Sequence, residues 1–189
     1  GESSNGTIVF VVGEAAVSKA DGRSVPAKPK DEIKSGDTIK TGKGAFVTIQ
    51  IADRGNLKVN ENTVLVLASV FDSGKTSLTV SQGSVYSKIK KMEKNSIYEV
   101  KTPVYVAAVR GTEFLASFDG AKGSVHVSDG KVAMVSSPKA GEPAPATPAP
   151  EEIISAKEGA VVYAQKKAAE PEIQRYSLNR TQMLELQKD

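Results

Sequence analysis

Residues 102–114 read TPVYVAAVRGTEF, and they carry more information about this chain than any other segment. The run is rich in β-branched and aromatic residues, which favour a strand. Thr102-Pro103 fits a strand entrance, because proline lacks the N–H group that an internal ladder position needs. Arg110 is a charge in an apolar run, where it is unfavourable unless it is paired or hydrogen-bonded. Gly111 directly after it indicates a bulge or the close approach of another backbone.

The rest of residues 7–135 continues in the same way, with short alternating or apolar runs separated by turn signals. Asp-Gly pairs at residues 119–120 and 129–130 are strong signals for tight hairpins. No segment of this region has the periodicity of an amphipathic helix. Residues 26–34 are polar and punctuated by proline, so we expect a loop there. The expected strands are residues 7–12, 15–18, 45–51, 56–60, 63–70, 76–81, 84–90, 96–101, 104–109, 112–118, 123–128 and 131–135.

A second motif, GDTIKTG at residues 36–42, precedes the first by about sixty residues. Together the two motifs resemble the FecR domain family, in which a Gly-Asp-x-[Ile/Val]-x-Thr-Gly turn is followed by Thr-Pro and then by Val-Arg-Gly-Thr-x-Phe. The resemblance covers roughly residues 6–135 and includes Asp-Gly-Lys-Val at 129–132, which is similar to the closing hairpin of the family. The motif residues, for which we expect a structural role, are Gly36, Asp37, Thr41, Gly42, Thr102, Pro103, Arg110, Gly111, Thr112 and Phe114.

The resemblance implies an all-β fold, a twisted and solenoid-like β-sandwich of many short strands. The spacing of certain glycines agrees with such a repeat. A glycine, a small residue and a large apolar one open strands at intervals of 36 to 40 residues, although chance could give the same pattern among 16 glycines. These glycines are Gly6, Gly44, Gly83, Gly123 and Gly159.

We expect three parts in the 189-residue chain: a polar leader at 1–6, one β-domain at 7–165 and a tail at 166–189. Within the β-domain, residues 136–150 are rich in proline and alanine and should form an extended, mobile excursion. A last strand pair within residues 152–165 should then return to the main sheet.

The tail contains the one expected helix, a short C-terminal segment at residues 177–188. Ser177 or Asn179 is the expected N-cap, because either side chain can accept a hydrogen bond from the first turn. The apolar residues of this helix form only a ragged stripe. It can therefore dock on the sandwich or bind a partner.

The composition leaves few groups for catalysis. The chain has no cysteine and a single histidine, His126, so histidine-based triads and the usual zinc sites cannot be assembled. Alternation places His126 opposite Val125 and Val127, so we expect it on the exposed face of a strand. Most candidate carboxylates lie in turns, where aspartate usually bonds its own backbone. We therefore predict no catalytic, metal or cofactor-binding residue and a protein that is not an enzyme.

Charge argues against a nucleic-acid partner, and hydropathy argues against a transmembrane helix in this sequence. The net charge is only +3, and no basic stripe with aromatic platforms predicts a nucleic-acid partner. No apolar run reaches the roughly 18–20 residues of a transmembrane helix. The leader GESSNG resembles the tether that follows the lipidated cysteine of bacterial lipoproteins, which would place a lipid anchor upstream. A remnant of cloning would look the same.

Arg110 has two interpretations. Its guanidinium could face a ligand, or it could bond backbone carbonyls or a carboxylate such as Asp37 or Glu113 and so hold turns together. We favour the structural interpretation, which predicts that Arg110→Ala destabilises the fold by several kcal/mol, about the scale for breaking a buried pair.

A run of lysines at residues 88–94 marks an expected hairpin tip. It could contact an anionic polymer, a lipid head group or an acidic partner, or it could be an ordinary solvated loop. The lysines of this candidate contact patch are Lys88, Lys90, Lys91 and Lys94.

The resemblance implies an exported bacterial protein, periplasmic or anchored to a membrane as a lipoprotein. Full-length family members also carry a cytoplasmic anti-sigma segment, a membrane helix and a small domain that meets a TonB-dependent receptor, and this sequence has no counterpart of the first two. We therefore predict a non-catalytic envelope module that engages another envelope protein, a receptor or a regulator, in signalling or scaffolding. The alternative is a module that binds cell-wall glycan, although the absence of tryptophan argues against it.

Overall fold

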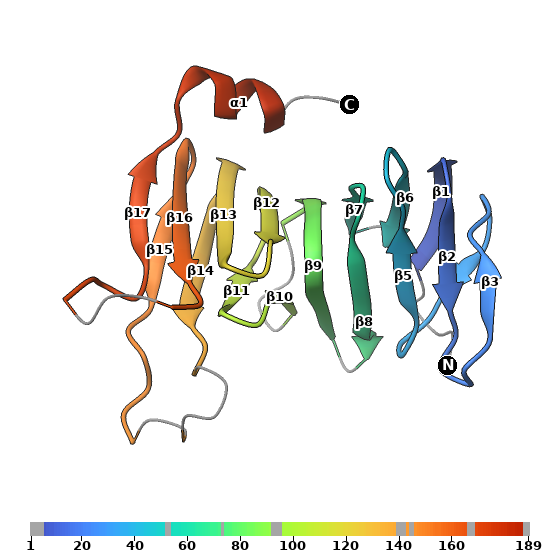
Figure 1. Ribbon diagram of the computed structural model, residues 1–189, viewed down its shortest axis with the longest axis horizontal. Helices are drawn as coiled ribbons and strands as arrows, with labels where there is room; N and C mark the ends of the chain where they lie inside the picture. Colours follow the sequence, from blue (N-terminus) through green and yellow to red (C-terminus); the bar gives the residue numbers. More distant parts are fainter. Residues whose placement is uncertain are drawn as a thin grey trace.

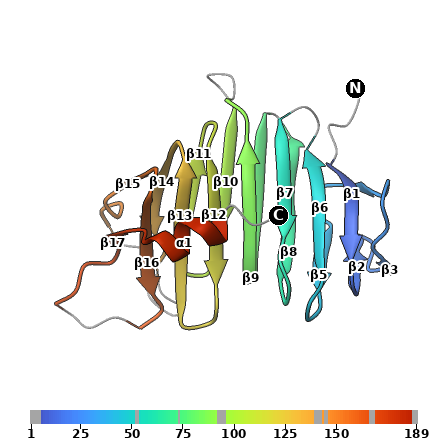
Figure 2. The same cartoon turned by 90° about the horizontal axis from the view of Figure 1, so that it is seen from above.

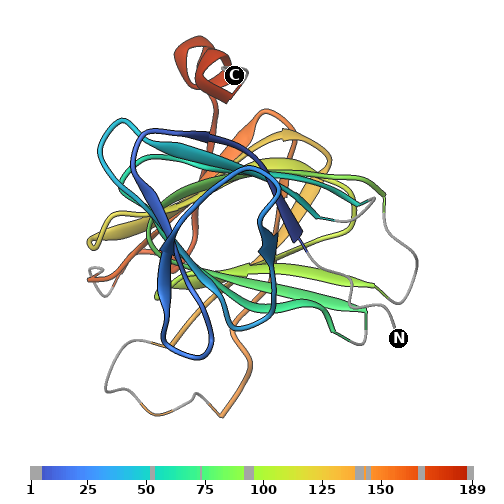
Figure 3. The ribbon, with the colours of Figure 1, turned by 90° about the vertical axis from the view of Figure 1, so that its right-hand side faces the viewer.

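The computed structural model describes residues 6–51, 54–72, 74–91, 96–138, 143, 146–165 and 169–186. These residues form a continuous 17-stranded sheet that is folded into two layers, with one short helix, α1 (Arg180–Leu186). The strands stand side by side along the long axis of the molecule (Figure 1), and the view along that axis shows the two layers facing each other (Figure 3). The all-β, solenoid-like sandwich with a C-terminal helix is confirmed. No described helix has the length and hydropathy needed to cross a membrane.

Each layer consists of strands that follow one another from the N-terminal to the C-terminal end of the molecule. Layer A contains β4 (Glu32–Ile33), β1 (Gly6–Val12), β6 (Phe46–Ile51), β7 (Gly55–Val59), β9 (Lys75–Ile89), β12 (Glu113–Phe118), β13 (Lys122–Asp129), β16 (Glu158–Tyr163) and β17 (Gln174–Ser177). Layer B contains β3 (Ser24–Pro26), β2 (Ala15–Ser18), β5 (Thr38–Thr41), β8 (Val64–Asp72), β9, β10 (Ile97–Lys101), β11 (Tyr105–Val109), β14 (Lys131–Ser136) and β15 (Glu152–Ser155). Among these strands the pairings are antiparallel, except that β9 and β10 are parallel.

Strand β9 belongs to both layers and joins them. Its first half pairs with β8 and β10 in layer B, and its second half pairs with β7 and β12 in layer A. The crossing occurs at Gly83, whose φ of +93° is readily adopted by glycine alone. The sequence predicts two strands here, at 76–81 and 84–90, because Gln82-Gly83 resembles a turn. That prediction is wrong, since the glycine bends one strand instead of reversing the chain.

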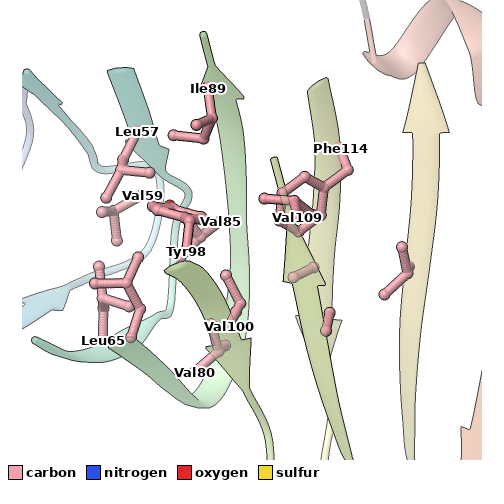
Figure 4. Packing of buried hydrophobic residues seen from close by; sticks show 14 of the residues in the cluster. Leu57, Val59, Leu65, Val80, Val85, Ile89, Tyr98, Val100, Val109 and Phe114 are labelled. Carbon is pink, nitrogen blue, oxygen red and sulfur yellow. The ribbon is translucent and has the colours of Figure 1, made fainter. Parts of the chain in front are cut away.

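The core lies between the layers and is built from alternate residues of nearly every strand. Its members are mainly valine, isoleucine and leucine, as expected for a pleated surface buried on one face. Figure 4 shows part of this packing around Tyr98 and Phe114, which are both almost completely buried. The Tyr98 hydroxyl lies 3.0 Å from Ser87 Oγ, so its polar end is satisfied inside the core.

A second buried tyrosine, Tyr105, packs directly on a glycine of layer A. A Cβ atom built on Gly123 would lie only 2.7 Å from the Tyr105 ring and 2.6 Å from a methyl group of Val104. The Tyr105 hydroxyl donates a hydrogen bond of 2.8 Å to the carbonyl of Ser124. The Tyr105 ring therefore occupies the space that a side chain at residue 123 would need.

The motif at residues 36–42 positions a buried carboxylate. Asp37 is only 2% exposed, and its Oδ2 accepts hydrogen bonds of 2.9 Å from the backbone N–H of Lys34 and from Lys19 Nζ. Thr41 Oγ1 donates to the carbonyl of Asn60 at 2.6 Å. Residues 38–41 form β5 and not only a turn, so the motif both starts a strand and links it to neighbouring loops.

The second motif supplies hydrogen bonds at the ends of β11 and β12. Thr102 Oγ1 accepts from the backbone N–H groups of Val104 and Tyr105, both at 3.2 Å, and Thr112 Oγ1 donates to the carbonyl of Lys131 at 2.8 Å. The backbone of Lys91 passes so close to Gly111 that a side chain on the glycine would lie 2.7 Å from it. The close approach of another backbone, expected from the sequence, is present. Pro103 is exposed just before β11, and Phe114 is buried on β12.

Arg110 differs from its expected role. Its side chain is exposed, and among the described residues it has no hydrogen-bond or ion-pair partner. The expected pairing with Asp37 or Glu113 is wrong, because Asp37 is bound by Lys19 and the Glu113 carboxylate accepts from Tyr86. The apolar face of β11 turns inward and ends at Val109, which leaves the arginine in solvent.

We therefore expect Arg110→Ala to be nearly neutral for folding. Loss of an exposed side chain that has no partner among the described residues should change the free energy of unfolding by less than about 0.5 kcal/mol. Urea denaturation of the variant and the parent protein measures this change. A loss of several kcal/mol would show that the arginine has a structural partner after all.

The C-terminal part of the chain rejoins the sandwich. β15 pairs with β14 in layer B, and β16 pairs with β13 in layer A. Four strands were not expected: β3, β4, β5 and the edge strand β17, of which β4 lies in the expected loop at 26–34. The helix begins at Arg180, and Asn179 is its cap: Asn179 Oδ1 accepts from Gln182 N and Gln182 Oε1 accepts from Asn179 N, both at 2.8 Å.

Candidate binding site on the outer face of layer A

The described part of the chain offers no converging set of catalytic groups. No cluster of histidine, aspartate and glutamate among these residues could hold a metal ion. His126, the single histidine, has Tyr176 as its described hydrogen-bond partner. The search for a site therefore turns to surfaces that could bind another molecule.

One continuous row of residues crosses eight strands on the outer face of layer A. Each member lies directly opposite the next in the strand register, from the N-terminal to the C-terminal end of the layer. In that order the row is Phe10, Thr48, Lys58, Tyr86, Leu115, His126, Gly159 and Tyr176.

Helix α1 lies over part of the C-terminal half of this face. It crosses the layer over β13 and β12, roughly perpendicular to the strands, and its C-terminal end points toward β9 (Figures 1 and 2). Leu186 faces the layer and is only 6% exposed, whereas Leu184 faces solvent and is 56% exposed. The helix thus covers the middle of the C-terminal half of the row and leaves the N-terminal half open.

The open half is a groove with a volume of about 590 Å³ that begins beside Leu186 and extends to β1. Its apolar walls come from aromatic side chains and from the helix: Phe10 and Phe46 have ring centres 5.8 Å apart, and Phe10 is 54% exposed. The residues that line it are Phe10, Phe46, Thr48, Asn56, Leu57, Lys58, Tyr86, Lys88, Glu113, Ser128 and Leu186. We call this hollow the layer A groove.

Two lysines and one carboxylate give the groove its charge. Lys58 Nζ lies 4.6 Å from the centre of the Phe46 ring, a cation–π contact. Glu113 accepts a hydrogen bond of 3.3 Å from the Tyr86 hydroxyl, which also lies 2.8 Å from Ser128 Oγ. Partial burial, with Glu113 nearby, raises the pKa of Tyr86, so this phenol stays protonated at neutral pH. It is a hydrogen-bonding wall of the groove and not a base.

At the other end of the row, His126 is covered by an edge strand. The prediction that it is exposed is wrong, because β17 brings Tyr176 over it with the tyrosine oxygen 2.6 Å from His126 Nε2. Gly159 makes room for this contact, since a Cβ there would lie 2.6 Å from the Tyr176 ring. Burial lowers the pKa of His126, so the neutral imidazole is favoured in the folded protein.

This lowered pKa predicts a loss of stability at acidic pH. The unfolded chain takes up the proton near pH 6.5, whereas the folded protein resists it, so the free energy of unfolding should fall as the pH drops from about 7.5 to about 5.5. The carboxylates titrate mainly below this window. The free energy of unfolding, measured with urea at the two pH values, should differ less in His126→Asn than in the parent protein. An equal difference in both proteins would exclude His126 as the cause.

Few of the residues singled out from the sequence line the groove. Lys88 does, and Lys90 and Lys91 are exposed beyond it, while Lys94 lies outside the described residues. The motif residues lie at the ends of strands and in the core, and none of them lines the groove. Sequence reasoning missed Phe10 and Phe46, because only the register across β1 and β6 brings them together.

Comparison with solved structures places the fold beside a crystallised protein from Parabacteroides distasonis. That protein is described as a putative anti-sigma factor and was solved at 1.65 Å and again at 2.50 Å. Each structure is 17% identical to this chain, with a TM-score of 0.58, and the match covers 75% of this chain and 60% of the other. The shared part thus spans less than two thirds of that protein, and at this identity the likeness concerns the fold.

Comparison with curated proteins gives no match. A family model described as FecR protein matches residues 37–133, which is about half of the chain and contains both motifs except for Gly36. The resemblance found in the motifs is thereby confirmed. The chain belongs to the FecR family.

Proposed function

We propose that this protein is a non-catalytic regulatory module of the bacterial envelope that acts by binding another envelope protein in a signalling complex. The observation that carries the proposal is the layer A groove, an apolar and partly aromatic hollow on a face that helix α1 covers only in part. A contiguous exposed apolar patch rimmed by polar groups often marks a protein-interaction site, and Phe10 and Phe46 form such a patch beside Lys58.

Two comparisons support the regulatory character of the module. FecR family members are envelope-associated regulatory proteins, and the solved protein with the same fold is described as a putative anti-sigma factor. Neither relation depends on catalysis, and the described residues hold no converging catalytic set. We extend these relations to a protein partner, with export to the periplasm or attachment as a lipoprotein as part of the same proposal.

Site-specific photo-crosslinking in living cells tests this function. A photoreactive amino acid replaces Phe10 at the rim of the groove, and a matched control carries it at Lys40, which is exposed on β5 in layer B. We expect the Phe10 position to capture a defined receptor or regulator that the Lys40 position does not. Capture of cell-wall glycan alone would favour a glycan-binding module, and absence of any specific product at either position would contradict the proposal.

A further inference from the structure

We propose that the layer A groove binds an amphipathic α-helix of the partner protein, whose apolar side is flanked by aspartate or glutamate residues and which lies across the strands in line with α1. This inference rests on the proposed function, because it names the element that the partner would insert. It follows from the backbone of the groove floor, from the position of α1, and from the charge of the walls.

The strands that form the floor of the groove have no free edge at which another strand could pair. It is formed by β6, β7 and β9, and each of these strands is paired on both sides within layer A. An extended peptide that entered the groove could not add itself as a strand, so its own N–H and C=O groups would lose water without gaining partners. A helix satisfies these groups internally and can bury its apolar side against the aromatic rings.

Helix α1 shows that this face accepts a helix. It lies on the same outer face, and Leu186 at its end is both buried and part of the groove wall. A bound helix would extend the cover of the layer from the end of α1 toward β1, between the lining residues Leu186 and Phe10. The intramolecular interface and the proposed one would therefore be continuous.

The register also sets the length of the occupant. From β9 to β1 the groove crosses three strand spacings of about 4.8 Å, or about 14 Å in total. About ten helical residues span that distance at 1.5 Å per residue, which is close to three turns. Such a helix presents apolar residues at positions i, i+3 or i+4, and i+7 to the floor.

The charge of the walls selects an acidic partner. Lys58 and Lys88 form no ion pair with a carboxylate among the described residues, and Glu113 accepts from the Tyr86 hydroxyl. Lys58 lies over the Phe46 ring, so its ammonium group is held beside the apolar floor. Carboxylates on both sides of the apolar stripe would meet these two lysines.

The test uses the purified protein and a displayed library of random peptides of about 14 residues, long enough for the helix described above. We expect enriched peptides to carry apolar residues at helical spacing with flanking acidic residues. A synthetic copy should become helical on binding, and its amides should perturb the NMR signals of the groove. The double variant Lys58→Glu/Lys88→Glu should bind at least about tenfold more weakly. Its matched control, Lys40→Glu/Lys43→Glu, changes two exposed lysines elsewhere and should stay within about twofold.

Three results would overturn the inference: enrichment of basic or strictly alternating peptides, equal loss of binding in both double variants, or no enrichment at all. A melting curve for each variant separates loss of binding from loss of folding. The crosslinking experiment keeps the two proposals apart. Capture of an envelope protein that contacts the groove through a strand or loop would leave the proposed function standing without the helix. Peptide binding as expected, without any capture in cells, would support a helix-binding groove and contradict the proposed function.

Discussion

Gly123→Ala should lower the free energy of unfolding by about 2–3 kcal/mol, because the new methyl group has no space. It would lie 2.6 Å from Val104 and 2.7 Å from the ring of Tyr105, and neither side chain can move without disturbing a fully packed core. Displacing the ring would also break the hydrogen bond from the Tyr105 hydroxyl to Ser124. Urea denaturation followed by circular dichroism measures the change.

Gly42→Ala is the matched control for this substitution. Gly42 is a motif residue, yet its φ is not in the left-handed region and the nearest atom to an added Cβ is the Glu14 carbonyl oxygen at 3.6 Å. The alanine should therefore be neutral or stabilise the protein by less than about 1 kcal/mol, by restricting the unfolded chain. Equal losses of unfolding free energy in the two variants would mean that the contact with Tyr105 is not the reason why alanine is unfavourable at residue 123.

Asp37→Ala is the second substitution with a large expected effect, a loss of about 2–4 kcal/mol. The change removes the acceptor of two hydrogen bonds of 2.9 Å, one from the backbone N–H of Lys34, which lies before β5, and one from Lys19 Nζ. Lys19 is 26% exposed and can be hydrated, which keeps the expected loss below that of a fully buried pair. Asp37→Asn should lose less, since the amide oxygen can still accept from the Lys34 N–H.

The control for Asp37 is an ion pair that is as short but lies in solvent. Asp21 and Arg23 are 2.8 Å apart, with side chains 55% and 73% exposed. Exposed pairs contribute about 1 kcal/mol or less, so Asp21→Ala should be much milder than Asp37→Ala. Thermal melts of the variants at one pH and salt concentration would settle the order, and similar losses at the two sites would show that burial of Asp37 adds nothing.

Much of the fold could be predicted because its signals are local. Alternation within a strand and Asp-Gly turns need only neighbouring residues, and they locate strands such as β11 and β13 within one or two positions. The short strands β3, β4, β5 and β17 were missed because each has only two to four residues, too few for an alternating pattern to stand out. Gly83 was misread for a related reason, since the same residue can reverse a chain or bend it.

The site was harder to predict, because it depends on register. Phe10 and Tyr86 are 76 positions apart in the sequence and share one row only through the pairings of β1, β6, β7 and β9. The lysine run pointed to the right region, yet only Lys88 lines the groove. Arg110 was misjudged because a charge in an apolar run was taken as buried, whereas the strand ends one residue before it.

Because β9 belongs to both layers, it affects how the protein unfolds. In most solenoids each repeat touches only its neighbours, so damage at one end can fray the structure step by step. Here a single strand is hydrogen-bonded to β7, β8, β10 and β12, so neither half can open fully without exposing it. The amide protons of β9 should then exchange with solvent only when the whole molecule unfolds. The molecule would unfold as one cooperative unit. Its abundance in the envelope would then respond sharply to a modest loss of stability.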